Sequence, residues 1–239
     1  MNNKKKILVF TATYNEAENI KVFLNDILNL KIKLDVLIVD DNSPDKTWEI
    51  VEKYSSTNNN IHLFKRQKKE GLDTAHKYAF NFAKDKGYDY FITLDADLSH
   101  DPKILPDFIK NLKKHPFVIG SRYVKNGKNE TKFFRFLLSF MGNKFIKFVS
   151  GIKCSEFTTS YRGFNLIELK NVDLNEVSAR GYSFFMETIF LIQRNNYEIK
   201  EIPIIFRDRT KGASKIPKTE ILRTLLNLFL LKIKNKKTN

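Results

Sequence analysis

Residues 90–97 read Tyr-Phe-Ile-Thr-Leu-Asp-Ala-Asp, a mostly apolar run that ends in two carboxylates. A short apolar run of this kind is typical of a strand buried on both faces of a parallel sheet. Ligands of open α/β sheets bind outside the carboxyl ends of the strands, where Asp95 and Asp97 would lie. Two hard oxygen ligands there favour a Mg²⁺ or Mn²⁺ ion that bridges a diphosphate. The alternative interpretation is a solvated acidic turn or a helix cap before Pro102.

The chain on either side of this stretch alternates between strand-like and helix-like segments. Four more strands are predicted, over 7–10, 36–39, 61–64 and 117–119. Four helices are predicted beside them, over 16–30, 45–54, 72–86 and 103–114. This alternation with short loops predicts an α/β fold, with a mostly parallel central sheet flanked by helices on both faces.

Two more polar clusters follow predicted strands, Thr-Tyr-Asn-Glu at 13–16 and Asp-Asp-Asn-Ser at 40–43. Because the carboxyl ends of parallel strands share one edge, these clusters are expected to converge with 95–97. An acidic residue after the second strand of such a sheet often contacts a base or a ribose. The same residue types also favour turns, so the role of 40–43 stays open between the two.

Basic residues form three groups whose function the pattern alone does not decide. Lys65 to Lys69 precede Gly71, and Arg122 ends the predicted strand at 117–119. Arg207, Arg209, Lys211 and Lys215 surround Gly212 and Ser214. Each group suits a phosphate, and the last suits a mobile phosphate-binding loop. Solvated loops and a surface ion pair are the alternatives.

The formal net charge of +15 attracts polyanions, which include nucleic acid, anionic membranes and phosphorylated substrates. A nucleic-acid-binding protein is one hypothesis, but it leaves the ordered acidic motifs without a role, so no nucleic-acid partner is expected. The single cysteine, Cys154, excludes an internal disulfide. No run of about 20 apolar residues is present, so no transmembrane helix is expected. The longest near-candidate, 221–231, is interrupted by Arg223.

The last part of the chain does not continue the alternation of strand-like and helix-like segments. A strand is predicted over 202–206, and the Phe-rich segment 133–149 and the segment 217–234 are predicted to be amphipathic helices. With the basic charge, both are candidates for contact with a membrane interface, although a place in the core is the alternative. The expected organisation is one domain over 1–216, followed by an amphipathic helix and basic tail over 217–239.

Together these motifs resemble family 2 glycosyltransferases of the GT-A fold, and among them the polyprenol-phosphate (dolichol-phosphate) mannosyltransferases. The matching stretches are 13–16, 39–47, 71–75, 94–102, 119–123, 182–184 with Glu187, 203–204, 208–209 and 212–215. The resemblance covers nearly the whole chain, and the order of the motifs is more specific than any one of them.

The resemblance implies a role for each matching residue. The donor nucleotide would contact Thr13, Tyr14, Glu16, Asp41, Asn42, Gly71 and Asp95. The metal would lie at Asp95, Asp97 and Ser99. The donor and acceptor phosphates would be surrounded by Arg122, Arg135, Arg209, Ser214 and Lys215. Asp97, Arg122 and Arg209 would carry the catalysis.

The resemblance further implies an inverting hexosyltransferase that moves mannose from GDP-mannose to a polyprenyl or dolichyl phosphate, with Mg²⁺ or Mn²⁺ as cofactor. It would act as a peripheral protein on the cytoplasmic face of a membrane, with or without small membrane subunits. UDP-glucose or another hexose donor, and a glycan or protein acceptor, are the alternatives.

The chain departs from the family pattern in three places. Thr11-Ala12-Thr13 replaces the usual proline before Thr-Tyr-Asn-Glu, and Ser99 stands where glutamine is frequent. Glu156 to Arg162 replaces Asp-x-Thr-Ser-Gly-Phe-Arg, so that Ser160 takes the place of a glycine and restricts the backbone. The third departure bears on the acceptor side of the expected site.

Overall fold

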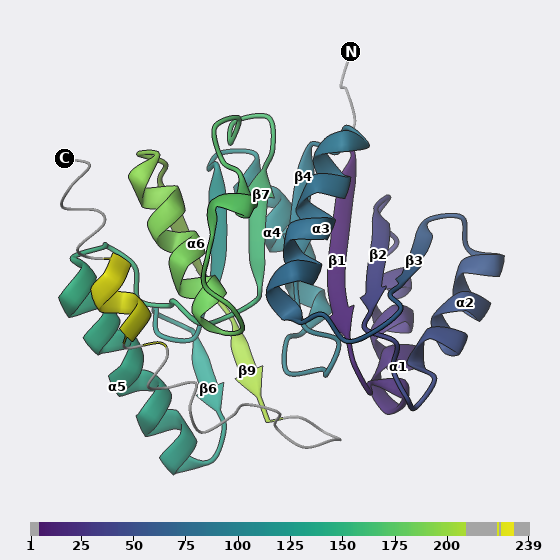
Figure 1. Ribbon diagram of the computed structural model, residues 1–239, viewed down its shortest axis with the longest axis horizontal. Helices are drawn as coiled ribbons and strands as arrows, with labels where there is room; N and C mark the ends of the chain where they lie inside the picture. Colours follow the sequence, from purple (N-terminus) through teal and green to yellow (C-terminus); the bar gives the residue numbers. More distant parts are fainter. Residues whose placement is uncertain (1–4, 209–223, 225, 232–239) are drawn as a thin grey trace.

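The computed structural model describes residues 5–208, 224 and 226–231. Its main sheet has seven strands in the order β3-β2-β1-β4-β7-β5-β8. Helices cover both faces of this sheet, with α3 and α6 on the face turned toward the viewer in Figure 1. The predicted α/β class with a mostly parallel central sheet is confirmed.

The first half of the chain forms the parallel strands β3, β2, β1 and β4 on one side of the sheet. Its strands are β1 (Ile7–Thr13), β2 (Asp35–Asp40), β3 (Ile61–Lys65) and β4 (Tyr90–Thr93). Its helices are α1 (Ala17–Asn29), α2 (Thr47–Thr57), α3 (Leu72–Asp85), the short 3₁₀ helix η1 (Pro102–Ile104) and α4 (Leu105–Leu112). All of them match predicted segments to within a few residues.

The apolar runs of the strands supply two cores, one on each face. Leu8 and Phe10 of β1 point into the core under α3 and α6, whereas Ile7 and Val9 point into the core under α1, α2 and α4. Successive strand side chains alternate between faces, so a strand that is apolar at every position requires cover on both. The sheet is therefore held from both sides, and its carboxyl-terminal edge is left for the polar clusters.

The sequence did not predict the strand that divides the sheet. β7 (Arg162–Asn165) lies between β4 and β5 (Phe117–Ser121) and runs antiparallel to both. Only Phe164 in it is apolar, so the pattern carries no strand signal. Gly163 allows α4 to approach closely, because a Cβ at this position would lie 3.0 Å from Leu112 Cδ1.

The single strand predicted over 202–206 is wrong in extent, because the chain leaves the sheet at Ile204. β8 (Ile199–Pro203) pairs with β5, whereas β9 (Ile205–Arg207) pairs with β6 (Lys128–Glu130) in a separate two-stranded sheet. As a result, Asp208, just after β9, contacts Arg135 in the helix that follows β6.

The helices of the second half differ in burial. α6 (Ser183–Arg194), which follows the 3₁₀ helix η2 (Leu174–Glu176), is buried over most of its length. α5 (Phe133–Ser150), predicted as a helix over 133–149, buries only Asn143 and Ile146. Helical residues 226–231 contribute Leu228 and Leu231 to the core. The expected boundary at 216/217 lies outside the described residues, and within them no helix is long and apolar enough to cross a membrane.

Candidate active site

The ends of β1 and β2 are joined through the buried carboxylate of Asp40. Thr13 Oγ1 donates to Asp40 Oδ2 over 2.7 Å, and Ser43 donates to the same carboxylate through its amide and its hydroxyl. Thr13 is 3% exposed and Asp40 is fully buried. Asp40 therefore fixes the shape of the loop after β2. Thr13, predicted to contact the donor, is buried as one of the hydrogen-bond partners of Asp40.

Asp41, the next residue, is held from two directions. Arg66 NH1 donates to Asp41 Oδ1 over 2.9 Å, and the amide of Gly71 donates to Asp41 Oδ2 over 3.0 Å. Arg66 also donates to Thr74 Oγ1 on α3. Arg66, from the basic stretch 65–69, thus points inward and forms an ion pair with Asp41. The pair joins the ends of β2 and β3 to the start of α3 around Asp41, a predicted nucleotide contact.

The other predicted donor contacts lie around this pair. Asn42 has the left-handed φ of 54° and donates through Nδ2 to the carbonyl of Gln67. The ring of Tyr14 lies 3.9 Å from Lys69 Nζ. Glu16 accepts from Asn19 and precedes α1, and its amide donates to Thr47 Oγ1. Thr13, Tyr14, Glu16, Asp41, Asn42 and Gly71 therefore come together at one edge of the sheet, as predicted.

Asp95 and Asp97 follow β4 at the same edge. Asp97 is 4% exposed, and its Oδ1 accepts from the amide of Ser99 over 3.0 Å and from the Ser99 hydroxyl. The Asp95 side chain is 38% exposed. Leu98, between Asp97 and Ser99, has a φ of 63°, so the chain turns sharply here. Ser99 orients Asp97, a role beside the metal-ligand role predicted for it.

His100 lies beneath this loop and is 1% exposed. Burial lowers its pKa, while the nearby carboxylates of Asp95 and Asp97 act in the opposite direction. As a neutral ring it accepts the Asp95 amide at Nδ1 over 3.3 Å, so its proton is on Nε2, 3.1 Å from Thr159 Oγ1. His100 thus connects the Asp95 loop to the segment before β7.

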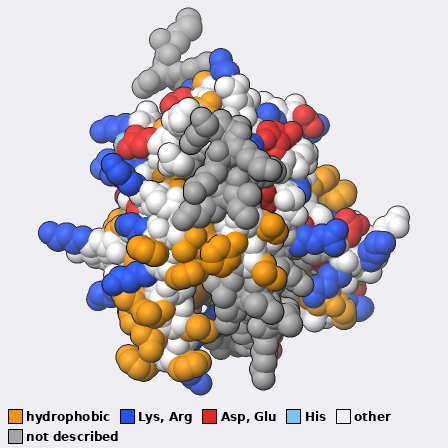
Figure 2. All heavy atoms as spheres, turned by 60° about the vertical axis from the view of Figure 1, so that its left-hand side comes forward, with side chains coloured by type: hydrophobic (Ala, Val, Ile, Leu, Met, Phe, Trp, Pro, Cys, Tyr) orange, Lys and Arg blue, Asp and Glu red, His pale blue; other side chains and the backbone are white. Residues whose placement is uncertain are grey.

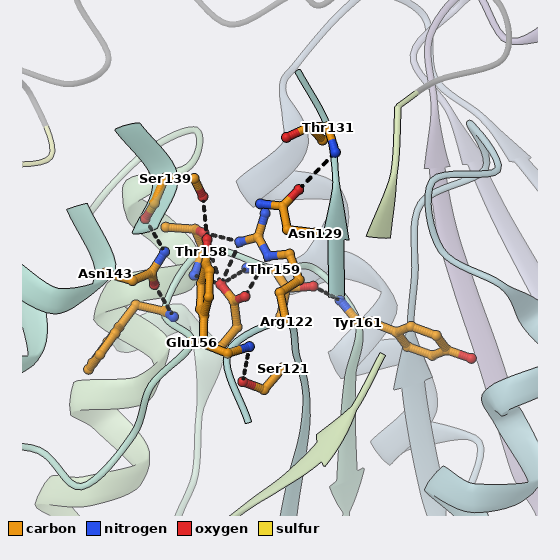
Figure 3. A network of polar contacts seen from close by, with 12 residues as sticks. Ser121, Arg122, Asn129, Thr131, Ser139, Asn143, Glu156, Thr158, Thr159 and Tyr161 are labelled. Atoms are coloured by element: carbon orange, nitrogen blue, oxygen red, sulfur yellow. Dashed lines mark hydrogen bonds and ion pairs between the residues drawn. The ribbon is translucent and has the colours of Figure 1, made fainter. Parts of the chain in front are cut away.

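Arg122 follows β5 and faces the same segment. It forms a side-on, bidentate pair with Glu156, with Nε and NH2 at 2.6 and 2.7 Å from the two carboxylate oxygens (Figure 3). Its side chain is 8% exposed. Burial lowers the Arg122 pKa, but the charge and hydrogen bonds of Glu156 outweigh this, with a contribution from Asp95, and the net pKa is raised. Arg122 therefore stays charged, and it connects to the Asp95 loop through Glu156, Thr159 and His100.

Arg135 lies in the first turn of α5. Its NH1 is 2.9 Å from Asp208 Oδ1, and Asp208 also accepts from the amide of Lys132 over 3.2 Å. Both side chains of the pair are more than one third exposed. This predicted phosphate contact is accessible and near the end of β9. The other predicted contacts on the acceptor side, Arg209, Ser214 and Lys215, lie outside the described residues.

Comparisons with known proteins show the family. The family model for glycosyl transferase family 2 matches residues 8–168. The chain belongs to this family. It is 32% identical over 212 residues to an undecaprenyl-phosphate mannosyltransferase of Micrococcus luteus, covering 88% of this chain and 87% of the relative. It is 29% identical over 227 residues to a polyprenol monophosphomannose synthase of Mycolicibacterium smegmatis, covering 94% and 86%.

Among solved structures, the mannosyltransferase PcManGT of Pyrobaculum calidifontis, in complex with GDP-Man and Mn²⁺, superposes with a TM-score of 0.60 at 18% identity. The match covers 98% of this chain and 72% of that one. The fold is thus the GT-A fold, as the resemblance implied. The chain is a glycosyltransferase whose relatives are polyprenol-phosphate mannosyltransferases.

The side chains available as metal ligands in this transferase suit a divalent metal. Asp95 and Asp97 offer hard carboxylate oxygens two residues apart, and no third His, Cys, Asp or Glu completes a metal-binding group within the described ranges. Mg²⁺ in particular is commonly held by one or two carboxylates, with substrate phosphates and water completing the coordination. The residues present match that pattern better than they match a closed protein cage.

Sequence reasoning missed two of the residues that build the site. Glu156 lies in the segment that departs from the family pattern, but the sequence does not mark it as a partner of Arg122, and His100 lies within the matching stretch 94–102 with no role assigned to it. Neither had a signal in the pattern, since each acts through a residue far away in the chain. Glu156 and Arg122 are 34 positions apart, and His100 and Thr159 are 59 apart.

Proposed function

We propose that this transferase moves mannose from GDP-mannose to a polyprenyl or dolichyl phosphate, with Mg²⁺ or Mn²⁺ at Asp95 and Asp97. The observation that carries the proposal is the edge of the sheet that holds the Asp41–Arg66–Gly71 cluster and the two carboxylates, with Arg122 connected to the Asp95 loop through Glu156, Thr159 and His100. The mannosyltransferase relatives and the GDP-Man complex of the structural neighbour support this choice of donor and acceptor.

In this reaction an acceptor phosphate oxygen bonds to the anomeric carbon as the bond from that carbon to the GDP diphosphate breaks, which inverts the configuration. A divalent metal held by Asp95 and Asp97 would supply charge neutralisation for the diphosphate. A lipid phosphate is already ionised near neutral pH, so the chain needs no strong general base. Arg122 and Arg135 would orient the acceptor, and Asp41 with Gly71 would hold the nucleotide, so that catalysis rests on positioning and charge.

The transferase would meet a polyprenyl phosphate at a membrane surface, and α5 offers an apolar face for contact with that surface. Phe134, Leu138, Met141, Phe145 and Phe148 recur along one side of α5 and are exposed. Leu226, Phe229 and Leu230 of the last described helix are also exposed. Figure 2 shows apolar side chains gathered on this side of the molecule, with Lys and Arg side chains around them. This composition is typical of a helix lying in a lipid interface.

The test supplies labelled GDP-mannose and polyprenyl phosphate in detergent, with either metal, and follows label that enters the organic phase. Asp97→Asn is expected to lower transfer by about 100-fold or more, because it removes a charge next to the diphosphate. The matched control is Asp101→Asn, in the same loop, whose carboxylate caps the Lys103 amide instead. The control is expected to keep activity within about threefold.

The outcomes separate the alternatives. Label that enters only a glycan or a protein would overturn the lipid acceptor. Transfer from UDP-glucose or another hexose donor, but not from GDP-mannose, would overturn the choice of sugar. Equal activity of the Asp97→Asn and Asp101→Asn variants would overturn the assignment of the metal site.

A further inference from the structure

Glu156 is a fully buried carboxylate in the segment that joins α5 to β7. Its Oε2 accepts Arg122 Nε, and its Oε1 accepts Arg122 NH2. Oε1 also accepts the Thr158 amide and hydroxyl, both at 3.0 Å, and the Thr159 amide at 3.2 Å. Figure 3 shows these contacts converging on the carboxylate from two segments of the chain. Both oxygens are thus occupied, and Glu156 is a structural acceptor within the protein.

The buried ion pair between Arg122 and Glu156 contributes little net stability to the fold. Desolvation of two charges offsets much of their attraction, and apolar replacements of similar volume are often as stable. Burial raises the Glu156 pKa, but Arg122 and the hydrogen bonds of Thr158 more than compensate, so its pKa is lowered and the carboxylate stays charged. What the pair does provide is a fixed orientation for the guanidinium.

The geometry leaves one edge of Arg122 for a ligand. Glu156 and Thr158 take up Nε and NH2, and no hydrogen bond from NH1 to another residue in the described parts of the chain is found. The rings of Phe206 and Tyr123 lie 4.9 and 5.2 Å from the guanidinium carbon and restrict its movement. The free edge of Arg122 is thus its NH1 group, whose two N–H donors suit phosphate oxygens.

The same carboxylate also connects to the loop of the two aspartates. The Thr159 amide donates to Glu156, and the Thr159 hydroxyl contacts His100, which in turn accepts the Asp95 amide. Asn143 of α5 joins the segment from the other side, because its Oδ1 accepts the Phe157 amide over 2.7 Å. Glu156 therefore lies where the Asp95 loop, the end of β5 and α5 meet.

We propose that Glu156 is a positioning residue, which sets the free edge of Arg122 toward an acceptor phosphate and fixes that edge relative to Asp95. The proposal rests on the proposed function in one respect, since it takes the ligand of Arg122 to be the phosphate of the acceptor.

The test compares Glu156→Gln with a matched control, Glu201→Gln. Glu201 of β8 accepts the amide of Ser155 over 3.0 Å, so the control removes a charge beside the same segment without touching Arg122. Glu156→Gln turns an amide toward the guanidinium, and it is expected to lower kcat/KM for polyprenyl phosphate about 10- to 100-fold. The KM for GDP-mannose is expected to stay within about twofold. The Glu201→Gln variant is expected to match the wild type, and Glu156→Asp to recover part of the loss.

Two further measurements keep positioning apart from a general loss of structure. The double variant Arg122→Lys/Glu156→Gln is expected to be little worse than Arg122→Lys alone, because the two residues act as one unit. Binding of a short isoprenyl phosphate in detergent micelles, measured without donor, is expected to weaken about 10-fold in Glu156→Gln and not in Glu201→Gln.

Different results contradict the positioning role and the proposed function. Additive losses in the double variant, or equal losses toward donor and acceptor, would overturn the positioning role. Absence of isoprenyl phosphate binding by the wild type would overturn it as well. If the wild type binds this phosphate in a Glu156-dependent way but transfers no mannose, the proposed function fails and the role of Glu156 stands.

Discussion

At the scale of single residues, Gly71 decides the geometry around Asp41. Its φ and ψ of 101° and 161° lie in a region that is essentially restricted to glycine. In this conformation its amide reaches Asp41 Oδ2 and α3 begins at the next residue. The position thus requires glycine for a backbone reason, independently of any ligand.

We expect Gly71→Ala to lower the free energy of unfolding by about 1–3 kcal/mol, because an alanine is strained in this conformation. It should also weaken nucleotide binding, since relaxation would move the amide away from Asp41. Denaturant unfolding and a nucleotide titration measure the two effects. Gly87→Ala is the control: it has a φ of 67° and open space around a new Cβ, so it should lose about 1–2 kcal/mol and bind nucleotide normally. Normal nucleotide binding by Gly71→Ala would contradict the assigned geometry.

Residues near strand ends could be placed from the sequence, and residues whose partners are remote could not. Asp41 and Asp95 follow apolar runs that can hardly be anything but buried strands, so their meeting at one edge follows from parallel-sheet geometry. The pairing of Arg122 with Glu156 depends on the insertion of β7 between β4 and β5, for which no local pattern exists.

At the scale of elements, periodicity predicts α5 well but leaves its purpose open. Its exposed apolar residues recur at helical spacing, and only Asn143 and Ile146 are buried against the rest of the molecule. A helix that packs so little against its own core gains little stability from its apolar side. This exposed apolar side is the observation behind the lipid surface in the proposed function.

Replacing Phe134 and Phe148 together by glutamate should reduce binding to anionic vesicles at least about 10-fold. Burial of a phenylalanine side chain contributes about 1.5–3 kcal/mol, and the two residues are 77% and 86% exposed without lipid. Co-sedimentation with vesicles measures the bound fraction. Val22→Glu on α1, an exposed apolar residue of another helix, should bind as the wild type does. Unchanged sedimentation of the double variant would exclude α5 as the lipid contact.

At the scale of the whole molecule, one buried histidine packs where β1, α3 and α6 meet in the core on one face of the sheet. His76 of α3 packs against Phe10 of β1, with ring centroids 4.9 Å apart, and against Phe184 and Phe185 of α6, at 5.5 and 5.0 Å. Burial, and then the charge of Arg162, lower its pKa from 6.5 to about 3. Arg162 itself is 1% exposed and donates to the carbonyls of residues 157, 159 and 185.

This lowered pKa makes stability depend on pH in one direction. Between pH 6.5 and about 3 the unfolded chain binds a proton at His76 that the folded chain does not. Stability from this residue is therefore complete above pH 6.5 and is lost as the pH falls toward 3. The loss approaches about 1.4 kcal/mol for each pH unit below 6.5. Burial lowers the His100 pKa as well, so that residue adds to the effect with the same sign.

We therefore expect the free energy of unfolding to fall between pH 7.5 and 5.5, with about 1.4 kcal/mol of the fall due to His76. His76→Leu cannot take up the proton in either state, so its fall should be smaller by that amount, whatever the variant loses in packing at pH 7.5. Denaturant unfolding at the two pH values measures the difference. A His76→Leu variant that loses as much stability as the wild type would show that the folded protein accommodates a charged His76, and that the core between α3 and α6 admits water.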